Sequence, residues 1–208
     1  MVKEYNIIIA SVGGQGGLTL SRVIAEAAFI SGYEVRTGET LGMSQRYGSV
    51  VSYVRFGTEV KSPLLTYGSA NVLIGLEPLE AVRVLKYLNK KVTIGIINAE
   101  PIPPVLSALS VIKKWSSYTY PDVNELINII HSNVRELYVI RGYEILKRFN
   151  ASRSLNTLLL GIYAAHPDNP LSSEAYEEAI KRVLRRDLEL NLRVFNEGLR
   201  IGREILGS

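Results

Sequence analysis

The chain has 208 residues, 47% of them hydrophobic and 21% charged, and a formal net charge of +4. This composition excludes an intrinsically disordered chain, because disorder combines low hydrophobicity with high net charge. Cysteine is absent, which excludes disulfides, a cysteine nucleophile, and iron–sulfur clusters or thiolate zinc sites held by this chain. At this length we expect residues 1–208 to form a single domain with a full hydrophobic core.

The basic surplus is spread evenly, because residues 1–100 and residues 101–208 each carry a net charge of +2. Nucleic-acid-binding proteins concentrate their basic groups in a patch or tail, so we expect no nucleic-acid partner. The apolar runs are too short for a membrane span, and we expect a soluble, cytoplasmic protein. The densest basic cluster suits either a solvated helix face or a site for an anionic partner. Its residues are Lys181, Arg182, Arg185 and Arg186.

The N-terminal segment predicts a strand, a glycine turn, a helix and a second strand. Residues 5–10 are largely apolar and run into a glycine-rich turn at 11–17. A helix is expected over 18–31, where Gly32 supplies a stop signal. The second strand is expected over 33–40, which completes a strand–turn–helix–strand unit.

Residues 49–56 alternate in the manner of a half-buried strand and are followed by Gly57 and Thr58. This pattern predicts a hairpin with residues 59–61, and therefore an antiparallel component in an otherwise parallel sheet. Three further strands are expected over 71–76, 92–98 and 136–140, and a stiff proline-rich loop is expected over 100–104. The remaining expected helices cover 78–88, 122–132, 145–148, 155–165 and, with a break, 173–206.

The order of these elements predicts a three-layer, Rossmann-like α/β fold with a mixed, mostly parallel sheet, an antiparallel hairpin and a helical C-terminal part. One face of the last helix is apolar and suits either packing on the domain or contact with another subunit. Its residues are Leu188, Leu192, Phe195 and Leu199.

A strand that runs into a glycine turn and a helix is the architecture of a nucleotide-phosphate site. The dinucleotide fingerprint is broken here, because Ser11 stands where its first glycine belongs, although Glu39 lies near the expected ribose-binding position. The chain has no Walker A sequence. The turn is therefore either a phosphate site or a tight structural turn.

A second glycine-rich run, residues 38–49, also follows a strand end. Because loops at the carboxyl ends of parallel strands share one crevice, we expect the two runs to lie side by side. Arg46 is a candidate for pairing with an anion, and Gln15, Ser44 and Gln45 are uncharged hydrogen-bonding candidates. Two such loops on one rim favour a binding surface over independent structural turns.

The chain lacks the usual residues for acid–base or covalent catalysis. Its two histidines, His131 and His166, are expected to be structural or solvated, and no aspartate precedes Asp122. No nucleophile elbow and no histidine pair at metal-binding spacing occurs. We therefore expect no catalytic residue and no metal ligand in this chain, which binds and positions rather than reacts alone.

Gly13-Gly14-Gln15-Gly16, together with the run from Gly42 to Val50, resembles the gamma domain of the pyruvate/2-oxoacid:ferredoxin oxidoreductases. The resemblance is strongest to the beta-subunit type of the indolepyruvate:ferredoxin oxidoreductases. Further similar stretches are 52–57, 62–64, 77–81, 102–104, Asn156, 159–161 and 191–198, so the resemblance covers nearly the whole chain.

The resemblance implies a subunit that covers the active site and helps to position coenzyme A during oxidative decarboxylation of a 2-oxoacid to an acyl-CoA. It implies a larger partner subunit that holds thiamine diphosphate, Mg²⁺ and iron–sulfur clusters, and ferredoxin as the electron acceptor of the holoenzyme. The implied interface and ligand rim consists of Gly13, Gly14, Gln15, Gly16, Gly42, Met43, Ser44, Gln45, Arg46, Gly48 and Ser49.

Two other hypotheses fit the sequence. The strand–glycine–helix unit suits an independent nucleotide-binding α/β protein, and the long C-terminal helices suit a purely structural or assembly protein. Under the subunit hypothesis, the isolated chain is expected to be inactive and able to self-associate through surface that normally meets its partner.

Overall fold

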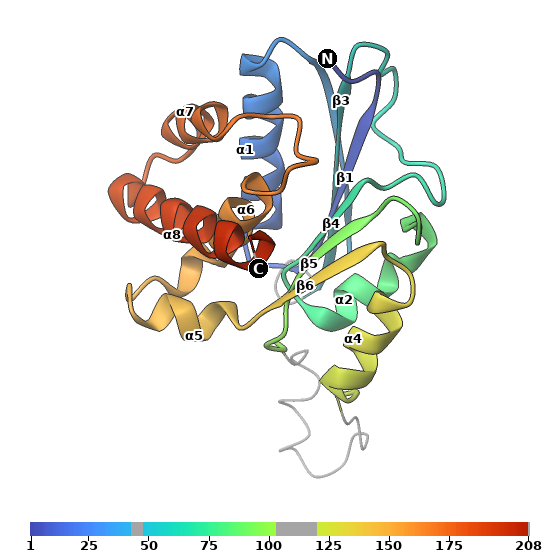
Figure 1. Ribbon diagram of the computed structural model, residues 1–208, viewed down its shortest axis with the longest axis vertical. Coiled ribbons are helices and arrows are strands. Elements are labelled where there is room, and N and C mark those ends of the chain that lie inside the picture. Colours follow the sequence, from blue (N-terminus) through green and yellow to red (C-terminus); the bar gives the residue numbers. More distant parts are fainter. Residues whose placement is uncertain (43–47, 103–119, 208) are drawn as a thin grey trace.

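The structure is a computed structural model that describes residues 1–42, 48–102 and 120–207. Its centre is a six-stranded sheet with the order β2-β3-β1-β4-β5-β6 (Figure 1). The strands are β1 (Tyr5–Val12), β2 (Glu34–Leu41), β3 (Ser49–Gly57), β4 (Val72–Gly75), β5 (Ile94–Asn98) and β6 (Glu136–Ile140). The expected strands exist with ends shifted by a few residues at most, except the one expected over 59–61.

The sheet is mixed and mostly parallel, as predicted. The pairs β1–β4, β4–β5 and β5–β6 are parallel, whereas β3 runs antiparallel to both β1 and β2. Helices cover both faces, so the expected three-layer α/β architecture is confirmed (Figure 1).

The predicted hairpin between residues 49–56 and 59–61 is wrong. β3 instead lies between β1 and β2, with registers Tyr5↔Phe56 and Val35↔Phe56. This position pairs β3 along both edges, whereas a hairpin with three residues would leave most of its backbone groups unpaired. The chain after Gly57 turns past the N-terminus, where the Glu59 amide donates to the Lys3 carbonyl oxygen at 3.1 Å. The first unit therefore has the predicted chain order, but β2 and β1 are not neighbours.

Alternation along β1 explains the two helical layers. Ile7 and Ile9 point into one hydrophobic cluster, and Ile8 and Ala10 point into the other, because successive side chains of a strand face opposite sides of the sheet. The first cluster is covered by α1 (Gly17–Ile30), α5 (Gly142–Lys147), α6 (Leu155–Ala164), α7 (Ser173–Val183) and α8 (Leu188–Leu206). The second is covered by α2 (Pro78–Arg83) and α4 (Val123–His131).

Local signals set several helix ends. Asp122 caps α4 by accepting hydrogen bonds from the Asn124 and Glu125 amides at 2.8 and 3.1 Å, as predicted. The helix expected over 78–88 is shorter: α2 ends at Arg83, and the 3₁₀ turn η1 (Leu85–Tyr87) follows. The 3₁₀ turn lets the Tyr87 carbonyl oxygen accept a hydrogen bond from the Ala70 amide at 2.9 Å.

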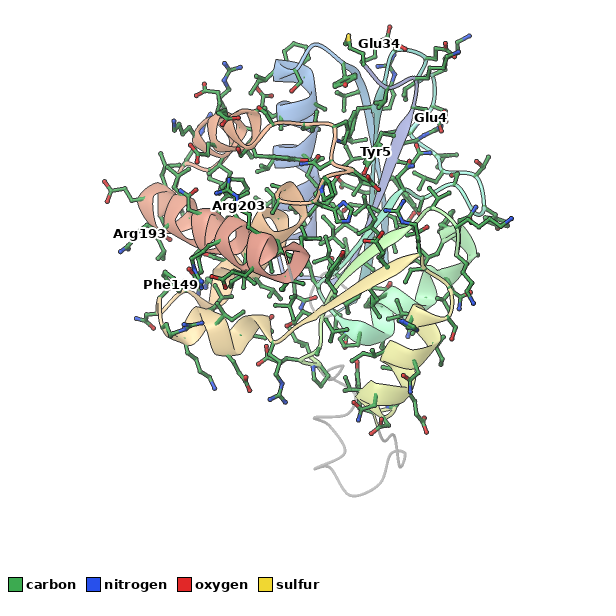
Figure 2. The ribbon with its side chains drawn as sticks, in the orientation of Figure 1. Glu4, Tyr5, Glu34, Phe149, Arg193 and Arg203 are labelled. Carbon is green, nitrogen blue, oxygen red and sulfur yellow. The ribbon has the colours of Figure 1, made fainter. Side chains whose placement is uncertain are left out.

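The apolar face of α8 packs on the domain. Phe195 and Leu199 are buried in the same cluster as α6, and Leu188 and Leu192 pack partly buried against it. Arg193 extends from the opposite, exposed face of α8 (Figure 2). The apolar stripe therefore serves the fold of this chain. Among the described residues, none of the helices combines the length and apolar character that crossing a bilayer requires.

Candidate functional site

The two glycine-rich loops meet at the carboxyl end of β1. The Gly13 amide donates to the Gly48 carbonyl oxygen at 2.8 Å, and the Gly42 amide donates to the Ser49 carbonyl oxygen at 2.8 Å. The predicted side-by-side placement is therefore confirmed for the described parts of both loops. Met43, Ser44, Gln45 and Arg46 lie outside the described residues.

The first loop leaves the beginning of α1 open. Gly14 and Gly16 adopt φ values of 103° and 83°, which only glycine reaches without strain. Gly16 is the N-cap of α1, and no side chain caps that helix end. Backbone amides of an uncapped first turn, with the positive end of the helix dipole, favour an anion.

Gln15 braces this loop from within. Its side chain is 7% exposed. Its Oε1 accepts a hydrogen bond from the Val12 amide at 2.9 Å, and its Nε2 donates to the Leu76 carbonyl oxygen at 2.9 Å. The Nε2 also lies 3.4 Å from the Tyr143 hydroxyl. Gln15 thus joins the ends of β1 and β4 to the segment after β6. Its side-chain amide is used in hydrogen bonds within the chain.

A cavity of about 460 Å³ opens beside the first loop. Its lining residues are Val12, Gly13, Gly14, Gln15, Ile102, Tyr143, Ser152, Arg153 and Leu155. They come from the carboxyl ends of the parallel strands and from the start of α6, so the cavity occupies the position where open α/β sheets bind ligands.

The cavity wall suits a negatively charged ligand. None of the described residues that line the cavity is acidic, and Arg153 is exposed with no carboxylate partner among them. Ser152 and Arg153 belong to the 3₁₀ turn η3 (Ser152–Ser154), which leads directly into α6. The glycine loop before α1, this 3₁₀ turn and the Arg153 guanidinium therefore line the cavity, and the guanidinium favours an anionic group.

The sequence reasoning missed Tyr143, Ser152 and Arg153. A signal existed for Tyr143, because the predicted strand over 136–140 places the residues after it on the same rim as the glycine loop. Nothing in the sequence around Arg153 distinguishes it from other exposed arginines. Its place in the site depends on how α6 packs behind α1, where the Asn156 Nδ2 donates to the Gly16 carbonyl oxygen at 3.2 Å.

Polar side chains hold the rim together between β4 and β6. The Asn98 Oδ1 accepts a hydrogen bond from the Gly142 amide at 3.0 Å, and its Nδ2 lies 3.3 Å from the Leu76 carbonyl oxygen. The Glu100 carboxylate accepts a hydrogen bond from the Tyr143 amide at 2.6 Å. These bonds fix the segment that carries Tyr143 into the cavity wall.

A buried carboxylate lies on the same rim. Glu77 is 1% exposed and caps α2 by accepting a hydrogen bond from the Glu80 amide at 2.9 Å. The Tyr120 hydroxyl also donates to it. Burial raises the pKa of Glu77, and the neighbouring Glu80 carboxylate raises it further, against the opposing effect of the hydrogen bonds.

The raised pKa of Glu77 predicts a pH-dependent stability difference. A carboxyl group whose folded pKa lies above its unfolded value of about 4.3 stabilises fully below that value, and the contribution is lost as pH rises through the folded pKa. Glu77→Gln keeps an acceptor and cannot ionise. We expect the unfolding free energy of this variant, measured in urea from pH 4 to 8, to increase relative to that of the wild type as pH rises. Glu125→Gln, on the exposed face of α4, is the control, and a Glu77→Gln difference that stays constant or shrinks would contradict the prediction.

The features that suggested a dinucleotide site do not assemble. The Ser11 hydroxyl is buried and lies 3.3 Å from the Val50 carbonyl oxygen. Glu39 is exposed on β2, an edge strand that β3 separates from β1. An acidic residue that binds a ribose must lie beside the glycine loop, so Glu39 is in the wrong place for that role.

His166 is structural, as predicted. Its Nδ1 accepts a hydrogen bond from the Asp168 amide at 3.1 Å, and its Nε2 lies 3.2 Å from a Glu136 carboxylate oxygen. His131 is exposed at the end of α4. Within 1–42, 48–102 and 120–207, no group of three or more histidine or acidic residues is arranged to hold a metal ion.

Comparison with known proteins identifies the family. The sequence profile of the pyruvate ferredoxin/flavodoxin oxidoreductases matches residues 6–201. The chain belongs to this family. Two of its curated relatives are named indolepyruvate oxidoreductase subunit IorB. The one from Thermococcus kodakarensis is 38% identical over 99% of this chain and 100% of its own length, and the one from Pyrococcus horikoshii is 38% identical over 99% of each chain. The chain therefore acts as part of an oxidoreductase complex.

Solved structures of family members share the fold. The pyruvate oxidoreductase subunit PORC of Thermotoga maritima has a TM-score of 0.68 at 17% identity, covering 95% of this chain and 96% of that chain. The gamma subunit of the keto/oxoacid ferredoxin oxidoreductase of Geobacter sulfurreducens has a TM-score of 0.65 at 20% identity, covering 98% and 99%. The 2-oxoglutarate:ferredoxin oxidoreductase of Magnetococcus marinus has a TM-score of 0.68 at 18% identity, and 98% of this chain matches 32% of that chain.

Proposed function

We propose that this family member is the cysteine-free subunit of a thiamine diphosphate-dependent, indolepyruvate-type 2-oxoacid:ferredoxin oxidoreductase. In this role it covers the active site of a larger, cytoplasmic partner subunit and positions coenzyme A for release of the acyl group as acyl-CoA. The observation that carries the proposal is the cavity between the glycine loop and Arg153, whose described lining residues include no acidic one. The phosphates of coenzyme A are the anions that such a site suits.

The residues present indicate which parts of the reaction belong to this chain and which belong to its partner. This chain supplies no cysteine, so cluster ligands must come from a partner. Thiamine diphosphate with Mg²⁺ in the partner would supply the electron sink for decarboxylation, and the clusters would pass electrons to ferredoxin. The structure of the Magnetococcus marinus relative contains bound coenzyme A and succinyl-CoA, which supports a coenzyme A role for the shared fold.

The chain's own residues would bind and orient the cosubstrate. The Gly14 amide and the Arg153 guanidinium would hold phosphate oxygens, and the hydroxyls of Tyr143 and Ser152 would add hydrogen bonds. The apolar walls formed by Ile102 and Leu155 would exclude water from the less polar part of the ligand. The second glycine loop, from Gly42 to Ser49, would complete the rim.

Arg153 gives the direct test of this role. In the complex reconstituted with the larger subunit, Arg153→Gln is expected to raise the KM for coenzyme A about tenfold or more, because a charge-assisted hydrogen bond is lost. The maximal rate at saturating coenzyme A should change little. Arg185→Gln, an exposed arginine after α7, is the control and should leave KM unchanged.

Two results would contradict the proposal at different levels. An unchanged KM and an unchanged calorimetric affinity for coenzyme A in Arg153→Gln would remove the cavity from the binding site. A larger subunit that reduces a viologen dye equally fast with and without this chain would overturn the subunit role itself.

A further inference from the structure

An exposed patch of aromatic and basic side chains lies at the end of the sheet opposite the cavity. Leu64 and Tyr67 are 68% and 72% exposed in the segment that leads into β4. Lys86 and Tyr87 belong to η1, which is tied to that segment by a hydrogen bond from the Gly68 amide to the Lys86 carbonyl oxygen at 3.0 Å. We call these four side chains, with the exposed Lys90 and Lys91, the tyrosine–lysine patch. The proposed coenzyme A site does not use it.

The aromatic and basic side chains of the patch contact one another. The rings of Tyr67 and Tyr87 meet edge to face with centroids 5.6 Å apart, and Tyr87 meets Tyr53 in the same way at 5.8 Å. The Lys86 Nζ lies 5.1 Å from the Tyr67 ring centroid and 5.2 Å from the Tyr87 ring centroid. Aromatic side chains held in place before binding lose little entropy when a partner arrives. Tyrosines in such positions are frequent energetic centres of protein interfaces.

The segments that carry the patch contain basic residues and no acidic ones. Residues 60–76 and 81–99 contain no aspartate or glutamate. Among the described residues, Lys86, Lys90 and Lys91 have no carboxylate partner. In the other basic cluster Arg182 pairs with Glu178 and Glu26, and the remaining three basic side chains are likewise without a carboxylate partner in the described part of the chain. The patch therefore presents cations that the chain itself does not neutralise, and its complement is a surface rich in carboxylates.

We propose that the tyrosine–lysine patch is a docking surface for a carboxylate-rich, partly apolar area of the larger partner subunit. The exposed Leu64 favours a protein partner, because a polyanion such as a nucleic acid gains little from an aliphatic contact. Because the patch and the cavity lie at opposite ends of the sheet, a contact at the patch leaves the cavity rim free to face the reacting centre. This proposal rests on the subunit role proposed above.

Charge reversal tests the surface in the reconstituted complex. Replacing Lys86, Lys90 and Lys91 by glutamate together is expected to raise the dissociation constant for the larger subunit about 100-fold at low salt, because electrostatic steering and complementarity are both lost. The difference should shrink at high salt. The matched control reverses Lys181, Arg185 and Arg186, which are equally exposed but lie on and after α7, and should change the dissociation constant by less than about threefold.

The aromatic contact has its own variant. Tyr67→Ser is expected to speed dissociation about tenfold or more, whereas Phe29→Ser, which removes a similarly exposed ring from α1, should not. All variants alter exposed side chains, and unchanged circular dichroism spectra and unfolding midpoints would verify their folding. Zero-length carbodiimide cross-linking should join Lys86, Lys90 or Lys91 to aspartates or glutamates of the larger subunit.

The outcomes separate this proposal from the one on which it rests. If the wild-type chain binds the larger subunit and the triple-lysine variant binds equally well, the docking surface is wrong and the subunit role stands. If the patch lysines cross-link only to ferredoxin, or bind nucleic acid instead, the docking surface is likewise wrong. If the wild-type chain fails to bind the larger subunit at all, the proposed subunit role is wrong, and the docking surface that rests on it is wrong as well.

Discussion

Replacing Gly198 with alanine is expected to destabilise the chain by about 3 kcal/mol or more, although alanine is the better helix former by about 1 kcal/mol. Gly198 lies in α8 where that helix crosses α6. A β-carbon at this position would lie 2.4 Å from the Leu158 carbonyl oxygen and 2.9 Å from the Gly161 α-carbon. Both neighbours are backbone atoms, so relief requires the two helices to separate. Separation would expose Phe195, which is fully buried at this contact.

Urea unfolding followed by circular dichroism measures this effect. Asn196→Ala is the matched control, because Asn196 is exposed on the same helix and the change there should be neutral or slightly stabilising. Gly161→Ala should reproduce the loss, since its β-carbon would lie 2.2 Å from the Phe195 carbonyl oxygen. A Gly198→Ala variant that unfolds at higher urea than the wild type would show that helix propensity outweighs the close contact.

Replacing Gln15 with methionine is expected to cost about 3 kcal/mol, because the change leaves the Val12 amide and the Leu76 carbonyl group without their partners in a buried site. Methionine keeps most of the volume, so the loss reports the hydrogen bonds rather than a cavity. In the reconstituted complex the same variant should raise the KM for coenzyme A, because Gln15 fixes the turn that carries Gly13 and Gly14.

A second variant at this position tests the same hydrogen bonds through the pH dependence of stability. Gln15→Glu retains the acceptor for the Val12 amide, but when ionised it places a carboxylate oxygen against the Leu76 carbonyl oxygen. Its destabilisation should therefore be small at acidic pH, where the carboxyl group can donate, and should increase as pH rises through the pKa of the new side chain. Equal stability of Gln15→Met and the wild type would contradict the bracing role.

Several strands and helices could be predicted because the sequence patterns that specify them involve only neighbouring residues. The apolar run before the first glycine turn and the Asp122 cap each act within a few neighbouring residues, and the structure places β1 and α4 accordingly. A break within 173–206 is also expected, and the structure places it between α7 and α8. The meeting of the two glycine loops was also predictable, because strand direction alone decides at which edge a loop lies.

The sequence by itself determined most of the strands and helices, and the motif pattern that marks the family. Only the tertiary structure decided how distant segments combine. It placed β3 between β1 and β2, because a strand pattern encodes which face is buried but not which neighbour supplies the hydrogen bonds. It also brought Arg153 to the glycine loop, and Tyr67 to Lys86, because side chains far apart in the chain meet only when helices and sheet pack into one core.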